Sequence, residues 1–164
     1  MGGRVLVAGI GNIFLGDDGF GVEVARRLGG QHLAEGVDVV DFGIRGVHLA
    51  YELSAGTYDA AILVDAMPRG GPPGTLYALE PGEADGTGAM AAALGDGHNV
   101  TPAIVLEWVR RTGGRCGRVL VVGCEPASVD ESMGLSDAVA ASVDPAVEMV
   151  RTLAAQLMDA PPCA

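Results

Sequence analysis

The chain contains apolar runs without polar alternation, bounded by glycine or acidic residues, which predict strands buried on both faces of a sheet. The first run ends in Gly9-Ile10-Gly11-Asn12, and the third leads directly into Asp65. A turn of composition PRGGPPG precedes the short fourth run, which favours an antiparallel strand at the edge of the sheet. We expect strands over residues 5–10, 37–42, 58–64, 75–79 and 119–124.

Apolar residues at helical spacing separate these strands, and turn-forming residues limit the helices. Gly29-Gly30 and Gly56 provide the stops of the first two helices, and Thr101-Pro102 is a typical N-cap and first-turn pair for the next. We expect helices over residues 20–28 and 47–53, a third from Thr101, and a C-terminal helical region that Ser136 caps and Pro145 kinks or restarts.

This alternation of strands and helices predicts the fold class. Right-handed crossovers between consecutive strands build a mostly parallel sheet with helices on both faces. A length of 164 residues suits one domain. We therefore expect a single-domain three-layer α/β/α fold over residues 1–164, with a twisted sheet of about five strands, one of them an antiparallel edge strand. Residues 80–100 are glycine-rich and lack periodicity, so we expect a loop beside the site there.

Composition and charge exclude several classes of function. Ten basic residues, all arginine, face 21 acidic ones, and the formal net charge of -11 repels a nucleic-acid backbone. The lack of lysine removes Schiff-base chemistry, a Ser-Lys dyad and a P-loop lysine. The apolar runs are too short to span a membrane, and the start of the chain does not resemble a signal peptide. With three cysteines and no CxxC pair, a reduced, cytoplasmic protein is the simplest interpretation.

The glycines after the first strand invite comparison with a dinucleotide-binding loop. In the GxGxxG pattern the third glycine would fall at position 14, which is Phe14. Asp17 and Asp18 would lie where a pyrophosphate binds, and their negative charges oppose it. Nucleotide binding is therefore a disfavoured interpretation of this loop.

Two carboxylates and one imidazole are the side chains best able to carry chemistry. Asp18 precedes the first helix, Asp65 ends the third strand, and His98 lies in a glycine-rich loop. If the first and third strands are neighbours, this set suits a divalent metal such as zinc or nickel, with positions open for another ligand. The alternative is structural, with Asp18 as a helix cap, Asp65 as a turn residue and His98 as a solvated loop histidine. Asp41, which closes the second strand, could join the site or merely start the turn at Gly43.

Other reactive side chains are weaker candidates. His32 and His48 fall at a helix end and within a helix, where we expect surface positions. Cys124 ends an apolar strand, which is typical of a buried, unreactive thiol. The sequence has neither a GxSxG nor an HExxH motif, so a standard serine hydrolase or zincin is not supported.

Segments spread over nearly the whole chain resemble one known family. GIGNIFLGDDGFGVEVARRL is similar to the first strand, acidic loop and helix of the hydrogenase maturation proteases. The resemblance continues, in the family's order, through DFGIRGVHL, AILVDAM, PPGTLYALEP, GHNVTPAIVLEWV and VLVVGCEPASVDESMGLSDAV. Residues 80–97 and the tail after about residue 155 lack a distinctive match. An ordered series of segments is more specific than any single motif.

The resemblance implies a function and roles for named residues. Members of the family are endopeptidases that remove the C-terminal extension of a nickel–iron hydrogenase large-subunit precursor, and the nickel belongs to that substrate. The family's acidic residue after the first strand, aspartate at the third strand and histidine before the next helix match Asp18, Asp65 and His98. These residues would bind the precursor's nickel and act through it, in a monomer that stores no metal. Asp41 and the turn at 43–46 match a further motif near the cleft.

Two other functions stay open on the residues alone. The same three ligands could hold the protein's own zinc in a metal-dependent hydrolase. A nickel-sensing maturation chaperone could bind the precursor without cutting it. For each of these functions, and for the protease, we expect Asp18 and Asp65 to lie on solvent-accessible loops.

Overall fold

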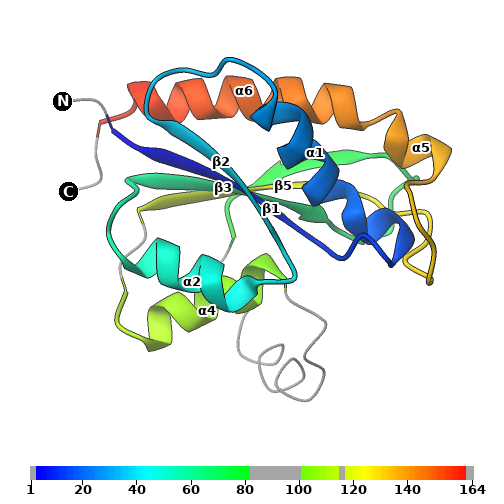
Figure 1. The fold of residues 1–164 in the computed structure, drawn as a ribbon, viewed down its shortest axis with the longest axis horizontal. Helices are drawn as coiled ribbons and strands as arrows, with labels where there is room; N and C mark the ends of the chain where they lie inside the picture. The colour runs from blue at the N-terminus through cyan, green and yellow to red at the C-terminus, as the bar shows by residue number, and fades with distance from the viewer. Residues whose placement is uncertain (1–2, 82–100, 115–116, 162–164) are drawn as a thin grey trace.

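The computed structural model describes residues 3–81, 101–114 and 117–161 of the chain. Its sheet has five strands in the order β2-β1-β3-β5-β4 (Figure 1). All pairs are parallel except β4 with β5, which are antiparallel at the edge. The strands are β1 (Val5–Ile10), β2 (Val37–Gly43), β3 (Ala60–Ala66), β4 (Leu76–Leu79) and β5 (Arg118–Cys124). The predicted α/β class and its antiparallel edge strand are confirmed.

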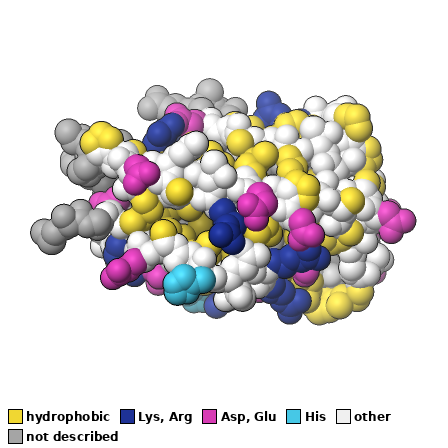
Figure 2. Space-filling view, turned by 90° about the horizontal axis from the view of Figure 1, so that it is seen from above, with side chains coloured by type: hydrophobic (Ala, Val, Ile, Leu, Met, Phe, Trp, Pro, Cys, Tyr) yellow, Lys and Arg dark blue, Asp and Glu magenta, His cyan; other side chains and the backbone are white. Residues whose placement is uncertain are grey.

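Helices cover both faces of the sheet (Figure 1). The sheet thus separates two apolar layers of the core, one on each face. One face carries α1 (Phe20–Gly29) and α6 (Val143–Asp159), and the other carries α2 (Gly46–Ser54) and α4 (Pro102–Arg111). Two short helices, η1 (Gly16–Gly19) and α5 (Asp137–Ala140), precede α1 and α6. Figure 2 looks onto the face of α1 and α6, where basic and acidic side chains lie together. Arg27 of α1 forms an ion pair with Asp144 of α6.

The expected helix starts are largely confirmed, with one difference. Thr101 caps α4, because its Oγ1 accepts a hydrogen bond from the Ile104 N–H at 3.4 Å. Pro145 lies in the first turn of α6, where a missing N–H costs nothing, so it marks a restart after α5. Ser136 precedes α5 but makes no side-chain cap, because its hydroxyl donates to Asp17 instead.

Most of the loop expected at 80–100 lies outside the described residues, which stop at residue 81 and resume at 101. His98 belongs to this part of the chain. Within the described ranges, every helix is too short or too polar to cross a membrane.

Candidate active site at the carboxyl ends of β1 and β3

The strand order brings the first acidic loop and Asp65 to the same edge of the sheet. β1 pairs with β2 on one side and with β3 on the other, and Gly9 lies opposite Val64. The strand order therefore reverses at β1, and ligands in such sheets bind beyond the carboxyl ends of the strands at this switch point. The condition set for a joint site, that the first and third strands be neighbours, is met.

Two glycines allow the acidic loop and α1 to lie directly on these strand ends. Gly11 has φ of 144°, and a Cβ at this position would lie 1.9 Å from the backbone oxygen of Asp18. A Cβ at Gly21 would lie 2.1 Å from the backbone oxygen of Val64 and 2.4 Å from that of Ile10. The glycines of the first loop and helix thus serve close packing of backbone on backbone.

Asp18 is partly buried and held by the loop that contains it. Its Oδ2 accepts a hydrogen bond from the Asn12 N–H at 2.8 Å. Burial raises the pKa of the Asp18 carboxyl above its ordinary value, and the Asn12 N–H opposes this only in part. The second carboxylate oxygen, Oδ1, has no hydrogen bond to a described residue that would fix it. Asp18 is thus held at one oxygen and can offer the other to a ligand.

Asp65 is a buried carboxylate with an unsatisfied oxygen. Only 4% of the residue is exposed, and its Oδ1 has no hydrogen-bond partner among the described residues. Burial raises its pKa well above the ordinary value, and the negative charge of Asp18 raises it further, against a lowering by the Ala66 N–H. A cation between the two carboxylates would remove both unfavourable effects.

The expected loop position of Asp65 is wrong. β3 continues through Asp65 and Ala66, which pair with Gly123 and Cys124 of β5, so the residue lies within the sheet. Asp18 also lies in a helix and not on an open loop, because it belongs to η1 between β1 and α1, and it is the more accessible of the two. One carboxylate is therefore fixed by the sheet and the other by the short helix that follows β1.

Asp41 lies at the same edge of the sheet but on the other side of β1 from Asp65. It is exposed, and its backbone oxygen accepts a hydrogen bond from the guanidinium of Arg45. The described residues contain no group of three or more His, Cys, Asp or Glu side chains able to hold a metal. The structure thus brings Asp18 and Asp65 together, leaves Asp41 at the margin, and does not describe His98.

Asp17, next to Asp18 in sequence, has a separate and structural role. It is 1% exposed, and its carboxylate accepts hydrogen bonds from the N–H groups of Ala127, Ser128 and Ser136 and from the Ser136 hydroxyl, at 2.7–3.2 Å. Burial raises its pKa, but these hydrogen bonds, led by the Ser136 N–H, outweigh burial and leave the pKa below its ordinary value. Asp17 therefore joins the loop after β1 to the loop after β5.

Glu125, directly after β5, is a second structural carboxylate that the sequence interpretation did not single out. It accepts hydrogen bonds from the N–H groups of Arg69 at 2.7 Å and Gly70 at 3.0 Å, and from the Tyr77 hydroxyl at 3.0 Å. The Arg69 N–H is the largest of the contributions that lower its pKa. An acidic residue at the end of an apolar strand was the available signal. Glu125 fixes the segment that follows Asp65.

A cavity of about 180 Å³ lies beside Asp65, between that segment and α4. Its lining is mostly apolar and includes Met67, Pro68 and Leu106. Two arginines, Arg69 and Arg110, also line it. The cavity could accept an uncharged side chain from an extended peptide.

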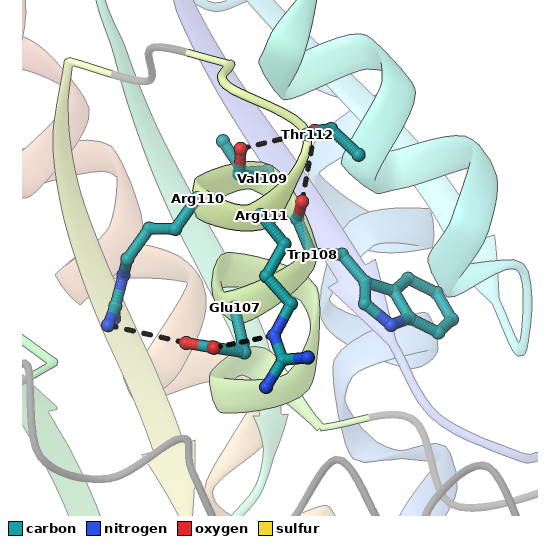
Figure 3. Close-up of polar contacts among 6 residues, drawn as sticks. All are labelled: Glu107, Trp108, Val109, Arg110, Arg111 and Thr112. Carbon is teal, nitrogen blue, oxygen red and sulfur yellow. Dashed lines mark hydrogen bonds and ion pairs between the residues drawn. The ribbon is translucent and has the colours of Figure 1, made fainter.

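The wall that α4 provides is held by its own polar contacts (Figure 3). Glu107, 8% exposed, pairs with Arg111 at 2.9 Å and with Arg110 at 3.6 Å. The Thr112 hydroxyl donates to the backbone oxygens of Trp108 at 2.9 Å and Val109 at 3.1 Å (Figure 3). These contacts close the C-terminal end of α4, where the two arginines also suit the helix dipole.

The weaker candidates behave as expected. His32 and His48 are exposed. Cys124 is buried, and burial raises the pKa of its thiol to about 11, which keeps it protonated and unreactive.

Comparison with known proteins gives a consistent result over most of the chain. A family model described as hydrogenase maturation protease matches residues 22–153. A putative hydrogenase maturation protease of Methanocaldococcus jannaschii is 33% identical over 149 residues, which cover 89% of this chain and 93% of the relative. The hydrogenase 2 maturation protease of Escherichia coli is 32% identical over 149 residues, covering 90% and 88%. The structure of the E. coli hydrogenase maturating endopeptidase HybD matches with a TM-score of 0.73 and 29% identity, covering 93% of each chain.

Proposed function

The chain belongs to the hydrogenase maturation protease family, and from this premise we propose that it removes the C-terminal extension of a nickel-loaded nickel–iron hydrogenase large-subunit precursor. In this proposal Asp18, Asp65 and His98 bind the nickel that the precursor carries, and they act on the precursor through that metal. The free enzyme stores no metal, and it works as a monomer in the cytoplasm.

The observation that supports this proposal most strongly is the unsatisfied carboxylate of Asp65 beside Asp18. When Asp65 is ionised, its buried oxygen without a hydrogen bond, next to a second negative charge, is unfavourable unless a cation binds there. Only Asp65 is held rigidly by the sheet, and Asp18 keeps one oxygen bound to Asn12. The two carboxylates are therefore positioned to bind a metal ion that the precursor brings.

The carboxylate and imidazole ligands favour transient contact with the nickel over its removal from the precursor. Carboxylate oxygens and an imidazole are modest ligands for nickel, and thiolates hold the ion more tightly. A precursor that carries nickel on cysteines would keep the ion while the protease binds at the open coordination positions of the nickel. Precursor without nickel would leave the two carboxylates to repel each other, so it would be positioned poorly.

The cavity beside Asp65 gives the peptide a place to lie. A residue next to the scissile bond would enter this mostly apolar space, while the bond itself lies near the two carboxylates. Arg69 and Arg110 at the wall would disfavour a basic side chain there. In this arrangement the pocket orients the extension, and the carboxylates position the metal.

Intact-mass analysis of a cognate large-subunit precursor tests the proposal. After incubation with this protein, nickel-loaded precursor should lose a short C-terminal peptide, and nickel-free precursor should keep its mass. Cleavage of nickel-free precursor by protein that retains stoichiometric metal on purification would instead favour a hydrolase with its own zinc. A stable complex with loaded precursor of unchanged mass would favour a non-cleaving chaperone.

A further inference from the structure

Three large apolar side chains are exposed on loops beside the candidate site. Phe14 is 63% exposed, Val129 49% and Met133 68%, and we call these three residues the apolar rim. Phe14 belongs to the loop after β1, and the other two belong to the loop between β5 and α5. Figure 2 shows hydrophobic side chains at the right-hand end of the molecule, where Figure 1 places the loop before α5. Large apolar residues gathered on neighbouring loops are typical of a surface that contacts another protein.

The two loops that carry the rim are bonded to each other. The Ser132 N–H donates to the Phe14 backbone oxygen at 3.0 Å, and the Ser132 oxygen accepts from the Gly16 N–H at 2.8 Å. The buried carboxylate of Asp17 adds its four hydrogen bonds between the same loops. The rim is therefore formed before any partner arrives, which lowers the entropy cost of binding.

One residue connects the rim to the candidate metal site. The Asn12 side-chain oxygen accepts from the Phe14 N–H at 2.9 Å, and the Asn12 N–H donates to Asp18 Oδ2 at 2.8 Å. Two hydrogen bonds through Asn12 thus separate the backbone of Phe14 from the Asp18 carboxylate. The rim therefore lies close in the structure to one of the two carboxylates.

We infer that the apolar rim is the docking surface for the folded body of the large-subunit precursor, next to its nickel; this rests on the proposed function. The partner surface is apolar with basic groups nearby, because the exposed acidic residues Asp130 and Glu131 lie between Val129 and Met133. The formal net charge of -11 steers such a partner toward the protein. The rim supplies affinity and alignment, and the carboxylates meet the metal.

Steady-state processing of nickel-loaded precursor, followed by intact mass, separates docking from chemistry. The double variant Phe14→Ala/Met133→Ala should raise KM about tenfold or more, as for residues central to an interface, and should leave kcat nearly unchanged. The conservative variant Phe14→Leu/Met133→Leu should recover most of the affinity. Tyr51→Ala is the matched control, since Tyr51 is 73% exposed but lies on α2, outside the rim.

The outcomes distinguish this inference from the proposed function. If the wild-type protein does not cut loaded precursor, the proposed function fails. If it does cut, and the double variant keeps the wild-type KM, the rim does not dock the precursor. An equal rise in KM for Tyr51→Ala would also overturn the inference, because the contact would then lie elsewhere or be diffuse. Unchanged thermal unfolding of the variants shows that a rise in KM comes from the surface.

Discussion

Replacing Asp65 by asparagine should stabilise the protein while it abolishes processing. Asparagine has the same shape as aspartate but carries no charge, and the native carboxyl is 4% exposed with one oxygen unbonded. A typical core substitution destabilises a protein by about 1 kcal/mol, so an increase in the free energy of unfolding would be unusual. It would mean that the ionised carboxylate is kept for function at a cost to stability.

The magnitude follows from burial and from the neighbouring charge. Asparagine keeps polar atoms at the same place, so the expected gain comes from removing the charge, and each unit by which a pKa is raised costs about 1.4 kcal/mol once the group ionises. We therefore expect Asp65→Asn to raise the free energy of unfolding by about 1 kcal/mol or more at pH 8. The pKa of Asp65 in the native protein is raised above the ordinary value of 3.8. The contribution of the neutral Asp65 to the free energy of unfolding is therefore complete below about pH 3.8, and it is lost as the pH rises through the native pKa. The advantage of the variant should thus disappear near pH 4.

Urea unfolding followed by circular dichroism at pH 4 and pH 8 measures this difference. Asp17→Asn is the matched control, because hydrogen bonds leave the pKa of Asp17 below 3.8. Losing the buried carboxylate that accepts four hydrogen bonds should cost on the order of 2–4 kcal/mol at both pH values. A destabilised Asp65→Asn at pH 8, or a gain that does not vary with pH, would refute the electrostatic reasoning for Asp65.

Three further variants and one control test the site and the fold. Asp18→Ala should lower kcat/KM for loaded precursor by about 100-fold or more with an unchanged circular dichroism spectrum, and an unfolded variant would make Asp18 structural. His98→Ala should weaken processing less completely in the same assay, and full activity would remove His98 from the site. Gly21→Ala should lower the free energy of unfolding by about 3 kcal/mol or more or prevent folding, because its Cβ would lie 2.1 Å from a backbone oxygen. Gly29→Ala, in the same helix with no atom within 4 Å of the added Cβ, should be nearly neutral in urea, and equal losses in both would contradict the close approach at Gly21.

The layered fold could be predicted because its signals are local. Apolar runs without alternation, stops at glycine and the Thr101-Pro102 pair each depend on a few adjacent residues, and the structure confirms the elements they indicate. The edge strand was also predictable, because a turn of glycine and proline precedes a short apolar run. Element ends were less certain: β3 continues through Asp65, because pairing with Gly123 holds an acidic residue inside the sheet.

The site could be predicted only in part, because burial and partners come from distant segments. Asp17 and Asp18 are equivalent as sequence, yet one binds the loop that contains Ser136 and the other approaches Asp65. No local pattern separates their roles. The role of Glu125 likewise depends on contacts with Arg69, which is 56 residues away along the chain.

X-ray absorption at the nickel K-edge tests most directly the claim that Asp18 and Asp65 bind the nickel of the substrate. Loaded precursor would be mixed with the protein and frozen within the first turnover, and co-elution would confirm that the complex has formed. The account predicts additional oxygen or nitrogen ligands on nickel in the complex, and their loss when the enzyme carries Asp18→Ala or Asp65→Asn. A spectrum identical to that of the precursor alone, in a complex that is formed and processed, would contradict it.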